Sequence, residues 1–119
     1  MKKILICEDE KDVRDSLTKI LSKIDYQVSS AENGQEAISQ ARALKPDLIL
    51  LDVRMPKIDG LEVAKEVRKF DKLAKIIFIT AFASEEIRKE ASRYDIYDYL
   101  IKPIPPEVII QKIEQSLEE

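Results

Sequence analysis

Acidic, hydroxyl and basic side chains follow the apolar runs of this 119-residue chain. Glu8 and Asp9 follow the run ILIC, Asp52 follows LILL, Thr80 follows IIFI, and Lys102 follows DYLI. If these runs are parallel strands, all of these side chains meet at one edge of the sheet. Such a set can bind a divalent cation and the oxygens of a phosphoryl group. A carboxylate in that setting can act as a nucleophile toward phosphorus.

The charges of this set predict a metal cofactor. Two carboxylates about 5 Å apart repel by about 3 kcal/mol at an effective dielectric constant of about 20. Three carboxylates therefore need compensating positive charge, and Lys102 supplies only part of it. Mg²⁺ prefers oxygen ligands and retains bound waters, so Mg²⁺ is the cation that the sequence predicts for this position.

Residue types that the chain lacks exclude several other chemistries. It contains no His, one Cys and two glycines, Gly34 and Gly60. Without His, the chain can form neither a Ser-His-Asp triad nor a histidine-ligated zinc site. One Cys cannot form an internal disulfide or a CxxC site. Two distant glycines cannot form a GxGxxG or Walker-type phosphate loop.

Overall charge and hydropathy limit the partners. The net charge is −3, from 20 basic and 23 acidic residues, which argues against direct binding to nucleic acid. The basic stretch Lys65–Lys72 is interpreted as a solvated helix face. No apolar run approaches the roughly 20 residues that span a membrane, and the first residues do not form a signal peptide. Together with the single cysteine, these features predict a cytoplasmic protein.

Five short β-prone runs predict the strands that position the acidic and basic side chains. They cover Lys3–Cys7, Gln27–Ala31, Leu48–Leu51, Ile76–Thr80 and Tyr97–Ile101. Three of them, ILIC, LILL and IIFI, are continuously apolar. Continuous apolar runs are typical of strands that are buried on both faces of a parallel sheet.

Helical patterns separate these runs. They begin, in chain order, at Val13, after the N-cap Asn33, near Leu61, after the N-cap Ser84 and at Pro106. In the first pattern, apolar residues continue at helical spacing to Ile24, and Pro46 ends the second. Strands and helices that alternate in this way predict an α/β fold, a doubly wound parallel sheet with helices on both faces. We expect one domain over residues 1–119.

Four segments carry a resemblance to a known family. ILICEDE, LLDVRMPKIDG, IIFITA and DYLIKP occur here in the order and at the spacing of the receiver domain of two-component response regulators. The chain resembles that family over its whole length. The resemblance implies a flavodoxin-like fold with five helices, five parallel strands in the order 2-1-3-4-5, and a cis Lys102–Pro103 peptide bond. It also implies a signalling switch that accepts a phosphoryl group, and not an enzyme that turns over a separate substrate.

The resemblance gives roles to the residues at the strand ends. Asp52 is the expected phosphoacceptor, Lys102 is expected to pair with a phosphoryl oxygen, and Thr80 is expected to hydrogen-bond the phosphoryl group. The expected Mg²⁺ ligands are Glu8, Asp9, Asp52 and the backbone carbonyl of Arg54. The acidic pair is Glu-Asp here, where the family usually has Asp-Asp, so Glu8 could reach the metal through a water.

A second set of residues is expected to act on other proteins. Thr80 and Tyr99 would form a switch pair that changes the face made by the fourth helix, the fifth strand and the fifth helix. That face would contact a downstream protein target. Because the chain lacks His, its phosphohistidine donor must be a partner, either a sensor histidine kinase or a histidine phosphotransfer protein. The residues expected to dock this donor are Asp12, Val13, Ser16, Phe82, Pro103 and Ile104.

Several alternatives stay open on the sequence alone. The chain could be a stand-alone receiver, which we favour, or the N-terminal receiver of a multidomain transcription regulator. A haloacid-dehalogenase-like phosphatase also uses a strand-end Asp with Mg²⁺, but it places a second Asp two residues on, where Arg54 stands. A flavodoxin-type binding module needs a phosphate loop where Glu8 and Asp9 stand. Taken singly, Asp52 could be a turn residue, and Tyr99 could be a half-buried strand aromatic.

Overall fold

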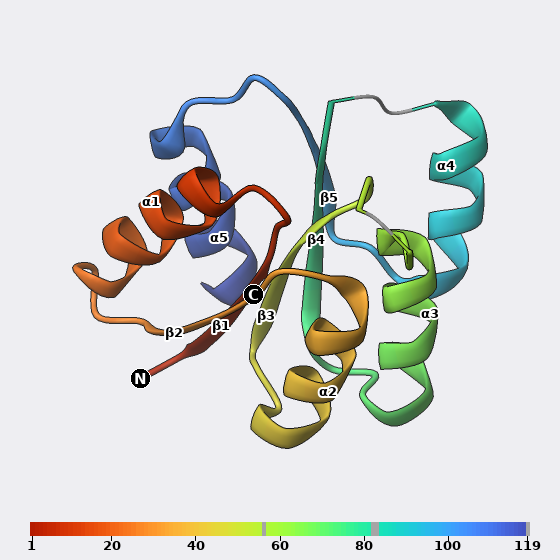
Figure 1. Cartoon of the computed structure of the whole chain (residues 1–119), viewed down its shortest axis with the longest axis horizontal. Helices are drawn as coiled ribbons and strands as arrows, with labels where there is room; N and C mark the ends of the chain where they lie inside the picture. Colours follow the sequence, from red (N-terminus) through yellow and green to blue (C-terminus); the bar gives the residue numbers. More distant parts are fainter. Residues whose placement is uncertain (56, 82–83, 119) are drawn as a thin grey trace.

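Three continuously apolar strands form the middle of a five-stranded parallel sheet (Figure 1). The structure is a computed structural model that describes residues 1–55, 57–81 and 84–118. The strand order is β2-β1-β3-β4-β5, which confirms the predicted fold class and order. The strands are β1 (Lys3–Cys7), β2 (Gln27–Ala31), β3 (Leu48–Asp52), β4 (Lys75–Thr80) and β5 (Asp98–Ile101).

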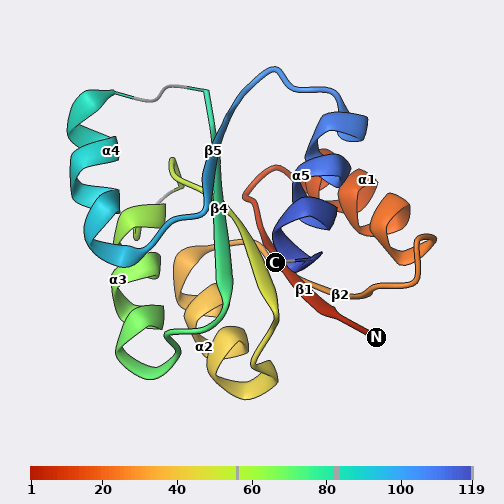
Figure 2. The same ribbon diagram turned by 180° about the vertical axis from the view of Figure 1, so that it is seen from behind.

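Helices cover both faces of the sheet. They are α1 (Lys11–Ser22), α2 (Gly34–Leu44), α3 (Gly60–Phe70), α4 (Glu85–Ala91) and α5 (Pro106–Glu118), with a short 3-10 turn, η1 (Ser92–Tyr94), after α4. The helices α1 and α5 lie on one face, and α2, α3 and α4 lie on the other, as the opposite view also shows (Figure 2). Within the described ranges, no helix is both long and apolar enough to cross a membrane.

Alternating side chains of the central strands fill two hydrophobic cores. In β1, Leu5 and Cys7 pack into the core shared with α2 and α3, whereas Ile4 and Ile6 pack into the core shared with α1 and α5. The strands β3 and β4 divide their side chains between the two cores in the same way. Because both faces of these strands are buried, their sequences are apolar without interruption. Their polar residues therefore begin where the sheet ends.

The observed boundaries differ from the prediction mainly at the first helix. All five strands agree with the predicted ranges to within one residue. The predicted apolar stripe reaches Ile24, but α1 ends at Ser22, and Ile24 is 38% exposed. The chain turns at Asp25, whose φ of 72° is a left-handed conformation. Ile24 therefore lies in a turn and not on the buried face of the helix.

Asn33 caps the N-terminus of α2, as predicted. Its side-chain oxygen accepts a hydrogen bond of 2.9 Å from the backbone N–H of Glu36. In Asn33→Ala this N–H loses that acceptor, and we expect the free energy of unfolding to fall by about 1 kcal/mol. Urea unfolding measures this loss. Gln35→Ala is the control because Gln35 is exposed in the same turn, and equal stability of the two variants would contradict the capping role.

Candidate functional site

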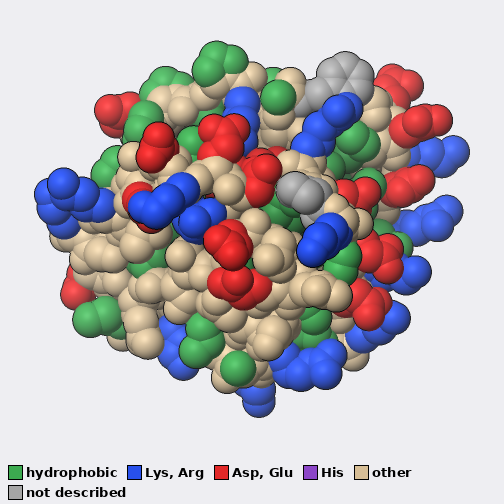
Figure 3. All heavy atoms as spheres, viewed as in Figure 1, with side chains coloured by type: hydrophobic (Ala, Val, Ile, Leu, Met, Phe, Trp, Pro, Cys, Tyr) green, Lys and Arg blue, Asp and Glu red, His purple; other side chains and the backbone are tan. Residues whose placement is uncertain are grey.

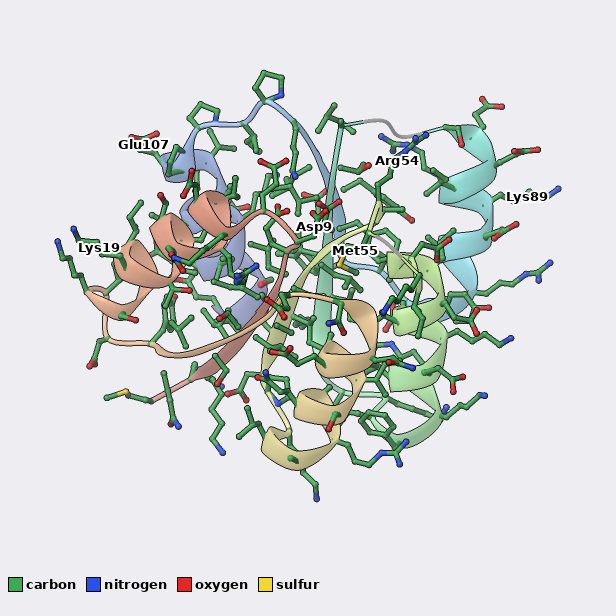
Figure 4. All side chains as sticks on the ribbon, in the orientation of Figure 1. Asp9, Lys19, Arg54, Met55, Lys89 and Glu107 are labelled. Carbon is green, nitrogen blue, oxygen red and sulfur yellow. The ribbon has the colours of Figure 1, made fainter. Side chains whose placement is uncertain are left out.

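The carboxyl ends of the strands bring the predicted site residues to one edge of the sheet. Glu8 follows β1, Asp52 ends β3, Thr80 ends β4, and Lys102 follows β5. The peptide bond between Lys102 and Pro103 is cis, as expected. Figure 4 shows Asp9 at the same edge, where the chain leaves β1.

Three carboxylates converge at this edge. One oxygen each of Glu8, Asp9 and Asp52 lies within 4.8 Å of the other two. Glu8 and Asp52 are buried, with 1% and 4% exposure, whereas Asp9 is exposed. Figure 3 shows acidic side chains on the surface where Figure 4 places Asp9. Two such charges repel by about 3 kcal/mol at an effective dielectric constant of about 20, so the cluster requires a cation.

Lys102 supplies positive charge to the cluster. Its Nζ donates hydrogen bonds to Oε1 of Glu8 at 3.0 Å and to Oδ2 of Asp52 at 3.1 Å. Burial lowers the pKa of the Lys102 ammonium, but its hydrogen bonds to Glu8 and Asp52 and their charges outweigh burial, so the pKa is raised above its ordinary value. The ammonium therefore remains charged at neutral pH.

Backbone amides orient the two buried carboxylates. The N–H of Arg54 donates to Oδ1 of Asp52 at 3.0 Å, and the N–H of Glu10 donates to Oε2 of Glu8 at 3.1 Å. Each buried carboxylate therefore has one oxygen on Lys102 and the other on the backbone. This arrangement gives each oxygen of the two buried carboxylates a hydrogen-bond donor.

The donor set fits a hard divalent cation. Its side-chain donors are carboxylate oxygens, and the exposure of Asp9 leaves the cluster open to solvent, from which a hydrated ion can enter. Partial desolvation, followed by the neighbouring carboxylate of Glu8, raises the pKa of Asp9.

Lys102→Met removes the cation that joins Glu8 and Asp52. The side chain of Lys102 is 23% exposed, while those of its partners are 2% and 5% exposed. We expect the free energy of unfolding to fall by about 2–3 kcal/mol, because two buried carboxylates lose their counter-charge. The control is Lys112→Met. Lys112 forms an ion pair with Asp98, both side chains are about one-third exposed, and such a pair contributes less than about 1 kcal/mol to stability. If urea unfolding gives equal losses for both variants, Lys102 does not compensate the cluster.

Gly60 allows α3 to begin directly against the strand that carries Asp52. The backbone N–H of Gly60 donates to the carbonyl oxygen of Val53 at 2.8 Å. A Cβ at position 60 would lie 2.7 Å from the carbonyl oxygen of Asp52 and 2.7 Å from Cα of Val53. No side chain fits at this distance from backbone atoms, so the position of Asp52 depends on this glycine.

Thr80 and Tyr99 lie on neighbouring strands and on the same face of the sheet. The register pairs Phe78 with Tyr99 and Thr80 with Ile101, and side chains two residues apart on a strand point the same way. Thr80 is fully buried and Tyr99 is half-buried. The two predicted switch residues are therefore diagonal neighbours across β4 and β5.

A groove lies beside the carboxylate cluster. Its volume is about 560 Å³, and it lies between α1, the end of β4 and the segment that joins β5 to α5. Lys102 contributes to its wall, so the groove is continuous with the cluster. Phe82 lies outside the described residues. The other predicted docking residues all line the groove: Asp12, Val13, Ser16, Pro103 and Ile104.

Sequence reasoning missed the burial of Arg68, which belongs to the last turn of α3, at the end of the helix away from Asp52. The stretch Lys65–Lys72 was interpreted as solvated, which is wrong for Arg68, because this residue is only 8% exposed. Its guanidinium donates hydrogen bonds to the backbone carbonyls of Tyr94, Asp95 and Asp71. The available signal was helical spacing, since Arg68 lies four residues after the buried Ala64. Arg68 connects α3 to the segment that precedes β5.

The sequence is similar to known signalling proteins. The family model of the response regulator receiver domain matches residues 4–114. The chain is 33% identical over 115 residues to the chemotaxis protein CheY of Thermotoga maritima, and the match covers 96% of each chain. Other relatives are longer transcriptional regulatory proteins, and the chain spans about half of their length (48%).

Solved structures share the fold. A CheY-like receiver domain protein from Methanospirillum hungatei superposes with a TM-score of 0.95 at 28% identity, over 99% of this chain and 94% of that chain. The response regulator TrrA of Thermotoga maritima, crystallised in complex with Mg²⁺ and BeF, superposes with a TM-score of 0.84 at 37% identity. That match covers 97% of this chain and 98% of TrrA.

Proposed function

Because the chain belongs to the response regulator receiver domain family, we propose that Asp52 accepts a phosphoryl group from a phosphohistidine of a partner protein. Response regulators are phosphorylated by histidine kinases and act on downstream targets, and receiver domains are signalling switches. One observation carries the proposal. Asp52 is buried at a strand end, bonded to Lys102 at 3.1 Å, and within 4.8 Å of two further carboxylates.

The proposed transfer exchanges a P–N bond for a P–O bond. A carboxylate oxygen of Asp52 bonds to phosphorus as the bond from phosphorus to the imidazole breaks. The electron pair returns to the ring nitrogen, which takes a proton from solvent. The backbone N–H of Arg54 remains hydrogen-bonded to Oδ1 of Asp52. The attacking atom is therefore Oδ2, which contacts Lys102. Lys102 then pairs with a phosphoryl oxygen.

Glu8, Asp9 and Asp52, with the backbone carbonyl of Arg54, would hold Mg²⁺. Receiver domains bind Mg²⁺ at an acidic pocket, and the related TrrA was crystallised with Mg²⁺ and BeF. When bound, the ion stabilises negative charge on the oxygens of the transferred group. Three carboxylates against one ammonium leave this cluster with net negative charge, which favours a divalent cation.

The proposed output passes through Thr80 and Tyr99. Phosphorylation draws the Thr80 hydroxyl toward the phosphoryl group, and Tyr99 follows because it is the diagonal neighbour of Thr80. The face formed by α4, β5 and α5 then presents a different surface to a downstream protein. This output serves a stand-alone receiver, as the sequence favoured, or the N-terminal receiver of a longer regulator. The relatives include proteins of both lengths.

The phosphohistidine donor is proposed to dock in the groove beside the cluster. The groove has an apolar floor that includes Leu17, Ile79 and Ile109, and acidic residues at Glu10 and Asp12. A donor with an apolar helix face and basic side chains at its margin would complement both features. The donor would be a sensor histidine kinase or a histidine phosphotransfer protein.

Ile104→Asp tests this docking surface, because Ile104 is half-buried and lines the groove. We expect transfer from a phosphohistidine donor to slow by about tenfold, which corresponds to about 1.4 kcal/mol. Uptake from acetyl phosphate should remain near that of the wild type, since this small molecule needs no docking surface. Leu73→Asp is the control because Leu73 is 91% exposed in the loop before β4 and does not line the groove. Equal slowing with both phosphodonors would rule out a docking role.

The proposed function is tested by incubating the protein with acetyl phosphate and Mg²⁺ and measuring its intact mass. We expect a gain of one phosphoryl group, and little gain when a chelator replaces Mg²⁺. Failure to gain mass from acetyl phosphate and also from phosphorylated histidine kinases would overturn the proposal.

A further inference from the structure

Arg88 lies over the ring of Tyr99, the proposed switch residue. The guanidinium carbon is 4.9 Å from the ring centroid, within the distance of about 6 Å at which an aromatic face attracts a cation. Arg88 belongs to the last turn of α4, and Tyr99 belongs to β5. The contact therefore joins two of the three elements of the proposed output face.

Phe78 fixes the Tyr99 ring from the interior. The two rings meet at an interplanar angle of 76°, with centroids 5.9 Å apart, and Phe78 is fully buried. Burial raises the pKa of the Tyr99 hydroxyl, and the charge of Arg88 opposes this rise. The ring is thus held by a fixed neighbour in the sheet and by a cation on a surface helix.

The contact with Arg88 belongs to one of two arrangements of Tyr99. Thr80 lies two residues after Phe78 on β4, so its side chain points to the same face of the sheet. For the ring to approach Thr80, the Tyr99 side chain must rotate or α4 must shift, and either change separates the ring from Arg88. In the arrangement described here, Lys102 bonds directly to Oδ2 of Asp52. A phosphoryl group bonded to that oxygen would displace this contact, so this arrangement goes with unmodified Asp52.

We infer that Arg88 is a positioning residue that holds Tyr99 in the unphosphorylated arrangement and thereby opposes phosphorylation of Asp52. The inference rests on the proposed function, since it requires Tyr99 to be coupled to Asp52. By linkage, a contact that stabilises one arrangement lowers the affinity for any ligand that requires the other arrangement. The affinity falls by at most the factor by which the contact shifts the equilibrium between the two arrangements. For an exposed cation over a Tyr ring, that factor is about two- to fivefold.

The experiment measures the affinity of the full chain for beryllium fluoride in the presence of Mg²⁺, by NMR titration. Arg88→Gln should bind this phosphoryl mimic about two- to fivefold more tightly than the wild type. It should also shift the ring resonances of Tyr99. Arg88→Lys restores a cation and should move both readouts back toward the wild type.

Lys89→Gln is the matched control. Lys89 is the next residue of α4, and its side chain points away from the molecule in Figure 4. This variant loses the same charge without touching Tyr99, so its affinity should equal that of the wild type. If the wild type binds beryllium fluoride but Arg88→Gln binds it with equal or lower affinity, the positioning role of Arg88 is rejected. If the wild type itself does not bind, the proposed function fails first.

Discussion

Asp52→Asn will abolish phosphoryl uptake while the protein stays folded. The variant side chain has the same shape and keeps the oxygen that accepts the N–H of Arg54 at 3.0 Å. It lacks the carboxylate that forms an acyl phosphate. Intact mass after incubation with acetyl phosphate and Mg²⁺ should therefore show no added phosphoryl group.

The stability of Asp52→Asn separates loss of chemistry from loss of structure. The substitution removes a buried ion pair with Lys102, but it also removes repulsion from Glu8 and Asp9. These effects oppose each other, so we expect the free energy of unfolding to stay within about 1 kcal/mol of the wild type. Asp59→Asn is the control, because Asp59 caps α3 and Asn caps equally well. Its uptake should equal that of the wild type, and full uptake by Asp52→Asn would place the acceptor elsewhere.

Gly60→Ala will destabilise the protein by about 3 kcal/mol and reduce phosphoryl uptake. The added methyl group would lie 2.7 Å from the carbonyl oxygen of Asp52 and from Cα of Val53. In a helix, alanine is more favourable than glycine by at most about 1 kcal/mol. This gain in helix propensity is smaller than the cost of the steric overlap. The strand β3 cannot move away freely, because it pairs with β1 on one side and β4 on the other. Urea unfolding and intact mass measure the two effects.

Gly34→Ala is the comparison for Gly60→Ala. Its methyl group would also be crowded, at 2.9 Å from Cβ and the carbonyl oxygen of Ile58 and 3.0 Å from Cγ2 of Val63. These atoms do not belong to the strand that carries Asp52. We expect Gly34→Ala to lose stability but to keep normal uptake in each folded molecule. If Gly60→Ala is as stable as the wild type, or if its phosphoryl uptake is normal, the proposed close approach of α3 to β3 is contradicted.

The sheet and the convergence at its edge were predictable because burial constrains both faces of the central strands. A strand such as Leu48–Asp52 has no polar residue until it leaves the sheet, so its first acid marks its end. Parallel strands end at the same edge. Residues far apart in the sequence, such as Glu8 and Lys102, could therefore be placed together from their positions after apolar runs, and their 3.0 Å contact agrees with this placement.

The contacts of individual basic side chains were less predictable. A long, flexible side chain reaches a partner that its own sequence does not specify. The contact of Arg88 with Tyr99 depends on how α4 packs beside β5, and a pattern of charges gives no such distance. Arg68 was predictable in part, since it lies on the buried stripe of α3. Its three carbonyl partners come from loop conformation, which periodicity does not describe.

The central claim is that the carboxylate of Asp52 is the phosphoacceptor, and chemical mapping of the phosphorylated residue tests it most directly. Borohydride reduces an acyl phosphate to an alcohol and releases phosphate, so a phosphorylated aspartate becomes homoserine. After reaction with acetyl phosphate and Mg²⁺, reduction and proteolysis, mass spectrometry should find homoserine at position 52 alone. A reduced residue at Glu8 or Asp9 in place of Asp52, or none in protein that has gained a phosphoryl group, would contradict the claim.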